Sequence, residues 1–147
     1  MHLTVSNTSD FSILSATPRW QQLQHPLLRR HNTELWLCHL TTAIAAVSGN
    51  KCLKLKHHLA QAKAEGKLGI VTFGGAFSNH ILAVAGAGAE FGFKTIGVIR
   101  GEELESKIQE NPTLAKAQEL GMQFYFVSRS AYRDKEETSF VSHLHDM

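Results

Sequence analysis

The sequence predicts an α/β fold, a three-layer arrangement in which a parallel sheet has helices on both of its faces. Three observations predict it. Short apolar segments at residues 68–73, 94–99 and 122–127 have the composition of buried parallel strands. Segments with helical character lie between them, and each ends at a glycine. Strands and helices that alternate at this spacing are typical of βαβ units with right-handed crossovers.

The composition is that of an ordinary globular chain. A length of 147 residues, with 43% hydrophobic and 19% charged residues, allows one hydrophobic core and excludes collagen-like, disordered and disulfide-scaffold proteins. The formal net charge of +2 is too small to indicate a surface for nucleic acid or for an anionic membrane. We therefore expect neither a nucleic-acid partner nor a membrane partner.

Cysteine content and targeting signals indicate a cytoplasmic protein without a metal site. Cys38 and Cys52 are too few and too far apart for a zinc motif or a CxxC redox pair, and they fit a reducing compartment. Residues 1–17 lack the basic start and apolar run of a secretory signal. The longest nearly apolar stretch, residues 81–89, is far shorter than the roughly 20 residues that cross a bilayer.

The first third of the chain gives the weakest pattern. We expect residues 1–33, which contain two prolines, to be mostly loop. A short run of large apolar residues at 34–40 (ELWLCHL) predicts a strand. Residues 41–47 are apolar and fit either kind of element. After a turn, leucines near helical spacing predict a helix over residues 51–65 that ends at Gly66.

The next helix begins at a polar segment after the strand at residues 68–73. Ser78 or Asn79 can cap it, and we expect it to extend to about Phe91 and to end at Gly92. Its sequence is rich in alanine and glycine (AVAGAGAEFG). A membrane segment is an alternative explanation, but the small residues more simply allow close packing against a sheet.

A third helix is predicted over residues 113–120. Asn111 is a capping residue, Pro112 occupies the first helical position, and Gly121 ends the helix. The tail at residues 131–147 is charged, with a few apolar residues that predict at most a weak terminal helix.

The first candidate site is the segment Ser-Gly-Asn-Lys, in which Lys51 falls in the first turn of a predicted helix. The positive end of the helix dipole disfavours a cation there by about 0.3–1 kcal/mol. A neutral amine suits attack on a carbonyl carbon and Schiff-base formation. The alternative is a solvated lysine beside Lys54 and Lys56, and it is the better explanation of this segment taken alone.

The second candidate site is the segment TFGGAFSNH at residues 72–80, where a strand gives way to glycines and a polar helix start. Ligands of doubly wound sheets bind at the carboxyl ends of strands, and helix N-termini attract anions. Ser78 offers a hydroxyl, Asn79 an amide and His80 a proton carrier. A capped helix after a tight turn is the alternative. The spacing matches neither the GxGxxG fingerprint nor a P-loop.

Six ordered motifs together resemble the family of D-cysteine desulfhydrase and 1-aminocyclopropane-1-carboxylate (ACC) deaminase. These are pyridoxal-phosphate (PLP) enzymes of the tryptophan synthase β-like fold. The motifs are SGNK (48–51), KLK (54–56), VTFGGAFSNH (71–80), GVIRGE (97–102), NPTL (111–114) and FVSRSAYR (126–133). The resemblance covers about residues 35–133 and reverses the preference for a merely solvated Lys51.

The resemblance implies a role for each candidate residue. Lys51 would form the Schiff base with PLP and then act as a base or acid on the substrate carbon. Asn79 would bond to the 3-hydroxyl of the cofactor, and Asn50 would face its phosphate. Ser78, with the backbone N–H groups of Asn79 and His80, would hold the carboxylate of a small amino-acid substrate.

His80 favours one activity within the family. Deaminase members tend to have Gln after Ser-Asn, whereas desulfhydrase-like members tend to have His. The resemblance therefore implies amino-acid metabolism by β-elimination from a D-cysteine-type substrate, which gives pyruvate, ammonia and sulfide. ACC deaminase activity is the alternative.

The resemblance also implies a domain layout. Residues 1–54 correspond to an incomplete part of the PLP-binding domain, 55–133 to the small α/β domain, and 134–147 to a charged tail. Family chains form homodimers, and they continue into a glycine-rich phosphate loop that is not found after Arg133. Residues 38–41 (CHLT) replace a Lys-Arg-Asp-Asp type run. We therefore expect a truncated chain that retains PLP weakly, or a non-catalytic α/β module.

Overall fold

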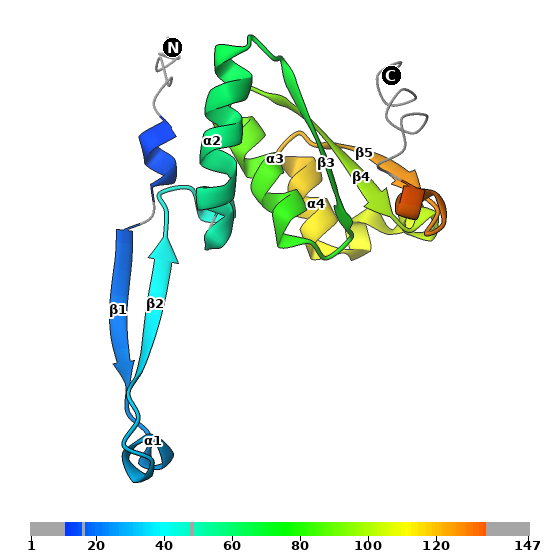
Figure 1. The fold of residues 1–147 in the computed structure, drawn as a ribbon. Helices are drawn as coiled ribbons and strands as arrows, with labels where there is room; N and C mark the ends of the chain where they lie inside the picture. Colours follow the sequence, from blue (N-terminus) through cyan, green and yellow to red (C-terminus); the bar gives the residue numbers. More distant parts are fainter. Residues whose placement is uncertain (1–10, 16, 48, 135–147) are drawn as a thin grey trace. The chain divides into compact units, whose positions relative to one another are not determined.

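The structure is a computed structural model that describes residues 11–15, 17–47 and 49–134. The chain divides into two compact units, Met1–Gly66 and Lys67–Met147, and each is described by itself. The α-helices and strands of both units are labelled in Figure 1. The tail expected to form a weak terminal helix lies, beyond Asp134, outside the described residues.

The first unit contains a two-stranded antiparallel sheet. Strand β1 (Thr17–Leu23) pairs with β2 (Leu35–Thr41), so that Thr17 lies opposite Thr41 and Leu23 opposite Leu35. The strand predicted at residues 34–40 is thus confirmed. The expectation that residues 1–33 are mostly loop is wrong for the part that the structure describes, residues 11–15 and 17–33, where most residues belong to a helix or a strand. The polar segment that forms β1 has little strand character of its own, and its backbone groups are satisfied by pairing with β2.

A short helix, α1 (Pro26–Arg30), connects the two strands of this hairpin. Pro26 occupies its first position, and Nδ1 of His25 accepts a hydrogen bond from the backbone N–H of Leu27 at 3.2 Å. The hairpin exposes two large aromatic side chains, because Trp20 is 61% and Trp36 is 50% exposed. They lie on the same face of the two-stranded sheet. Trp36 is paired with Gln22, and Gln22 is two residues from Trp20 on β1, so its side chain points to the same side.

The remaining elements of the first unit are helical. They are the 3₁₀ helices η1 (Phe11–Leu14) and η2 (Ala45–Val47) and the helix α2 (Asn50–Ala64). The buried residues of α2, Cys52, Leu55 and Leu59, recur at helical spacing, and the helix contacts η1. Gly66 follows with a φ of +66°, a conformation that favours glycine. The helix predicted over residues 51–65 is confirmed.

The second unit is an α/β fold with a parallel sheet, as predicted. Its strands are β3 (Gly69–Gly75), β4 (Lys94–Arg100) and β5 (Gln123–Val127), in that order across the sheet. Both strand pairs are parallel. The carboxyl ends of all three strands therefore meet at one edge of the sheet, where Gly75 pairs with Arg100 and Arg100 with Val127.

Two α-helices connect these strands, and they contact each other (Figure 1). In the order β3-β4-β5, successive right-handed crossovers lie on the same side of the sheet, so these two helices cover one face of this unit's sheet and not both faces as predicted. They are α3 (Asn79–Phe91) and α4 (Pro112–Glu119). The 3₁₀ helices η3 (Glu102–Glu110) and η4 (Ala131–Asp134) follow β4 and β5. The stretch of α3 from Ala83 to Gly88 is buried without interruption, as expected for a helix of small residues packed on a sheet.

The helix boundaries follow the capping residues of the sequence. Ser78 is the N-cap of α3, and Gly92 ends that helix in the left-handed conformation. Asn111 is the N-cap of α4, and Oδ1 of Asn111 accepts hydrogen bonds from the backbone N–H groups of Thr113 and Leu114. The positions predicted for both helices from these capping residues are confirmed.

Candidate functional site

The site residues predicted from the sequence fall into two groups. Asn50 and Lys51 belong to the first unit, and Ser78, Asn79 and His80 belong to the second. Each group is at the start of a helix, as the sequence indicated. The structure brings Asn50 next to Lys51 and Ser78 next to His80.

Lys51 lies in the first turn of α2. Its Nζ donates a hydrogen bond to Oδ1 of Asn50 at 3.0 Å, and it makes no ion pair with any described residue. The N-cap residue Gly49 has a φ of +65° and provides no side-chain cap, although Sγ of Cys52 donates to the Gly49 carbonyl at 2.8 Å. The amine is therefore held by a neutral amide rather than by a carboxylate.

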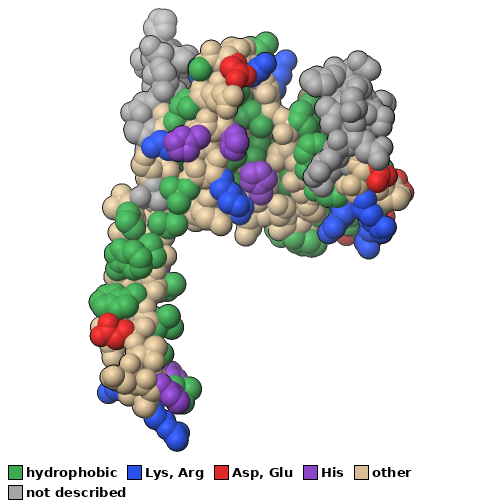
Figure 2. Space-filling view, in the orientation of Figure 1, with side chains coloured by type: hydrophobic (Ala, Val, Ile, Leu, Met, Phe, Trp, Pro, Cys, Tyr) green, Lys and Arg blue, Asp and Glu red, His purple; other side chains and the backbone are tan. Residues whose placement is uncertain are grey.

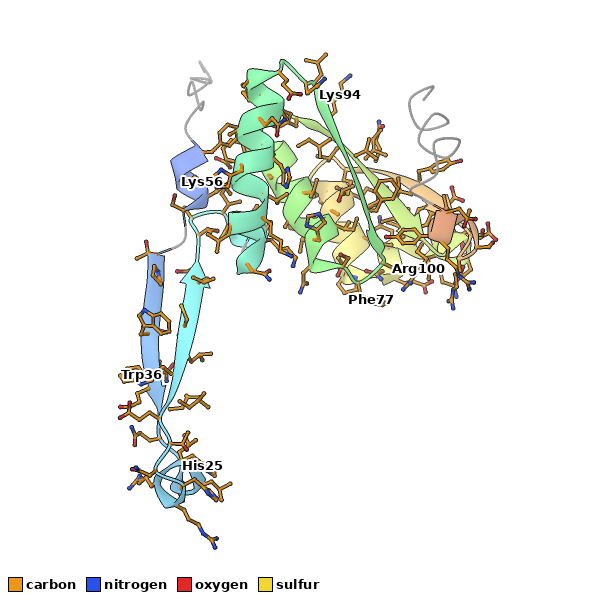
Figure 3. All side chains as sticks on the ribbon, in the orientation of Figure 1. His25, Trp36, Lys56, Phe77, Lys94 and Arg100 are labelled. Carbon is orange, nitrogen blue, oxygen red and sulfur yellow. The ribbon has the colours of Figure 1, made fainter. Side chains whose placement is uncertain are left out.

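The next lysines of the same helix have a different environment. Lys56, labelled in Figure 3, donates from Nζ to Oγ of Ser15 at 2.8 Å and so connects α2 to the segment after η1. Lys54 is exposed and makes no hydrogen bond or ion pair with a described residue. The two lysines are useful controls for Lys51 because they lie three and five residues further along the same helix.

Ser78 joins the end of β3 to the start of α3. Its backbone N–H donates to the Gly75 carbonyl at 3.0 Å, and its Oγ accepts from the backbone N–H of His80 at 3.2 Å. A hydroxyl also has one hydrogen to donate, so the Ser78 O–H remains able to donate to a ligand. Asn79, the first residue of α3, is exposed. The capped-helix explanation of this segment is therefore correct, and it leaves the Ser78 hydroxyl able to act.

The two glycines before this helix have different roles. A Cβ at Gly74 would lie 2.6 Å from Cγ1 of Ile81, so that glycine allows α3 to pack on β3. A Cβ at Gly75 would meet only Nη2 of Arg100, at 4.0 Å. Gly74 is thus required by the packing, whereas Gly75 has space around it and faces an arginine.

That arginine belongs to a pocket that the sequence analysis missed. The pocket has a volume of about 740 Å³ and lies at the carboxyl edge of the three strands. Phe77 and Arg100, labelled in Figure 3, come from two of the segments that line it. Figure 2 shows basic side chains gathered at one place on the second unit. The lining residues are Gly75, Ala76, Phe77, Ser78, Arg100, Glu103, Leu104, Arg129, Tyr132 and Arg133.

A sequence signal for this pocket existed. Arg100 ends one predicted strand region, and Arg129 comes two residues after the next. Because parallel strands end at the same edge, residues that follow successive strands converge there. Both arginines also lie in the motifs GVIRGE and FVSRSAYR, which gave no indication of a shared pocket.

One carboxylate faces these arginines. Nη2 of Arg129 lies 2.9 Å from Oε1 of Glu103, and both side chains are largely exposed. A backbone hydrogen bond at Glu103 and, after it, the Arg129 guanidinium hold the pKa of the Glu103 carboxyl below its ordinary value of 4.5. The pair therefore remains charged at neutral pH.

Comparison of the sequence with protein-family models and with curated proteins gives no match. Within the described ranges, no three His, Cys, Asp or Glu side chains form a group that could hold a metal ion. None of the helices described in the structure combines the length and the apolar character that crossing a membrane requires.

Proposed function

We propose that this chain is a PLP-dependent lyase related to D-cysteine desulfhydrase and ACC deaminase, and that it acts on a small amino acid. In this proposal the chain is part of a tryptophan synthase β-like fold. The observation that carries the proposal is the Ser78-capped start of α3 at the carboxyl edge of a parallel sheet. That edge is where α/β proteins bind small ligands.

The residues at the start of α2 fit covalent attachment of PLP. The reacting group must be an amine that is not neutralised by a carboxylate, and Lys51 has only the Asn50 amide as its partner among the described residues. Bound PLP supplies the electron sink for the reaction. The described residues of this unit include no glycine-rich loop for the phosphate, so we expect weak retention of PLP.

Ser78 would orient the substrate. Because Oγ of Ser78 already accepts from the His80 N–H, the hydroxyl hydrogen can be donated to one oxygen of the substrate carboxylate. The backbone N–H of Asn79, in the first turn of the same helix, suits the other oxygen. The Asn79 side chain is exposed and would bond to the 3-hydroxyl of the cofactor.

Lys51 would then move a proton. By the family resemblance, its Nζ would take the proton from the carbon that bears the substrate carboxylate, and the thiol group would leave from the neighbouring carbon as sulfide. Addition of one water completes the conversion of cysteine to pyruvate, ammonia and sulfide. The His80 side chain favours this elimination over ACC deamination, which is the alternative activity.

Turnover by the purified full chain tests this proposal. With PLP added in excess, D-cysteine should give equal amounts of sulfide and pyruvate, and ACC should give less ammonia. Lys51→Ala should abolish turnover, whereas Lys54→Ala should leave it unchanged. Ser78→Ala should raise KM for D-cysteine about tenfold through loss of a hydrogen bond to a charged group. Equal turnover by the wild type and Lys51→Ala would refute the proposal.

A further inference from the structure

The pocket at the carboxyl edge of the sheet is built from three separate segments. They follow β3, β4 and β5 and contribute Phe77, Arg100 and Arg129, respectively. The parallel order of the strands makes these segments neighbours. A pocket at this edge has the position of a ligand site, and its volume of about 740 Å³ suits a small organic molecule.

The lining of this pocket is strongly basic. Among the described lining residues, three guanidinium groups, of Arg100, Arg129 and Arg133, face a single carboxylate, that of Glu103. These described residues therefore carry a net charge of two positive units. Glu103 pairs with Arg129, while Arg100 and Arg133 make no ion pair with any described residue. Two guanidinium groups thus keep their N–H donors for a ligand.

Arg100 is held in place by an aromatic contact. Its Cζ lies 5.8 Å from the centroid of the Tyr132 ring, which in turn makes an edge contact with Phe73 at 6.4 Å between ring centroids. A stacked guanidinium keeps its planar fork of N–H groups available for an oxyanion. Arg100 is therefore oriented before a ligand arrives.

The segments that carry the other arginines are also fixed. The backbone N–H of Gly101 donates to the Val127 carbonyl at 2.8 Å, which ties the start of η3 to the end of β5. Oγ of Ser128 accepts from the backbone N–H of Ala131 at 3.1 Å, and the N–H of Arg133 donates to the Ser130 carbonyl. Arg129 and Arg133 therefore lie on a turn that these hydrogen bonds hold in place.

The pocket also has an apolar side. Phe77 is 74% exposed at the mouth of the pocket, and Leu104 lines it from η3. A large exposed aromatic beside convergent cations suits a ligand that has both an anionic and an apolar part. An inorganic anion would use only the arginines.

From these observations we propose that the pocket binds an organic phosphate. A phosphate monoester carries about two negative charges at neutral pH, which match the net charge of the lining. Its oxygens can accept from guanidinium groups on two segments, Arg100 at the end of β4 and Arg129 and Arg133 after β5, whereas one carboxylate group carries a single charge. The proposal rests on Arg100, Arg129 and Arg133, to which the proposed PLP chemistry assigns no role, although Ser78 lines the same pocket.

Calorimetric titration of the full chain with phenyl phosphate tests the proposal. Arg100→Gln and Arg133→Gln should each raise the Kd about tenfold, the usual effect of losing a hydrogen bond to a charged group. Lys94→Gln is the matched control. Lys94 lies at the opposite end of β4 from Arg100 (Figure 3), and its substitution also removes one positive charge. The Kd of this control should be unchanged.

Two further variants test the charge of the pocket and its apolar side separately. Glu103→Gln removes the only carboxylate among the described lining residues and should lower the Kd severalfold. Phe77→Ala should abolish the preference for phenyl phosphate over inorganic phosphate, and the Kd for inorganic phosphate should be unchanged. Because an increase in affinity cannot come from misfolding, Glu103→Gln tests the charge argument independently of stability.

Other outcomes would overturn the proposal. They are a lack of saturable binding at millimolar phenyl phosphate, an equal loss in Lys94→Gln and Arg100→Gln, or tighter binding of succinate, which presents two carboxylates instead of a phosphate. Lys51→Ala should bind phenyl phosphate as the wild type does. The pocket can therefore bind its ligand even if the proposed lyase activity is absent, and the two proposals fail separately.

Discussion

Gly88 of α3 lies so close to Thr95 of β4 that a Cβ on Gly88 would overlap Cγ2 of Thr95. The same Cβ would be only 2.9 Å from the Phe93 carbonyl oxygen. Backbone atoms cannot move aside as a flexible side chain can. This contact explains why a helix in the middle of the chain has glycine at a buried position, where glycine is otherwise unfavourable.

Gly88→Ala should therefore destabilise the chain. Alanine would gain up to about 1 kcal/mol of helix propensity, but overpacking against Thr95 and Phe93 costs about 1–3 kcal/mol. We expect a net loss of about 1–2 kcal/mol in the free energy of unfolding, measured with urea. Gly75→Ala, where a Cβ has space, should not destabilise the chain. Equal effects of the two substitutions would contradict the packing argument.

The Asn111 cap gives a second stability prediction. Oδ1 of Asn111 accepts from the N–H groups of Thr113 and Leu114 at 3.0 and 3.1 Å, and the residue is only 6% exposed. Asn111→Ala should lower the free energy of unfolding by about 1–2 kcal/mol. Asn111→Ser keeps a side-chain acceptor and should lower the free energy of unfolding much less. A thermal midpoint unchanged in the alanine variant would show that this cap is not significant.

The Glu103 carboxyl gives a prediction about pH. Its pKa in the folded chain is below the ordinary value of 4.5, so the folded state favours the ionised form. The resulting stabilisation is fully present above 4.5 and is lost as the pH falls through the lower, folded pKa. Urea unfolding measured at neutral pH and below 4.5 should show this loss.

Two substitutions separate the causes of that loss. Glu103→Gln should make stability less dependent on pH in the acidic range, and Arg129→Gln should do so only in part, because a backbone hydrogen bond also lowers the pKa of Glu103. If Glu103→Gln keeps the full acid dependence of the wild type, other carboxyls are responsible.

Much of the second unit could be predicted from the sequence because its signals are local. Ser78, Gly92 and Asn111 each end or begin a helix through their own side chain or backbone conformation. The buried strands between these helices are short apolar runs. Local capping and composition were therefore sufficient to predict a parallel α/β unit.

The features that the sequence did not reveal depend on contacts between distant residues. Strand β1 contains Pro18, Arg19 and glutamines, and it exists as a strand because β2 pairs with it. The η3 helix after β4 was not predicted. The basic pocket was missed because its arginines are far apart in the sequence, and Arg100 and Arg133 come to line one pocket only when parallel strands end at the same edge.

Titration of the full chain with PLP, followed by visible absorbance, tests the central claim about Lys51 most directly. The account predicts a band in the wild type that is kept in Lys54→Ala and Lys56→Ala and is lost in Lys51→Ala. The two control lysines exclude attachment of PLP to any exposed amine. A band of equal strength in Lys51→Ala, or no band in the wild type, would contradict the account.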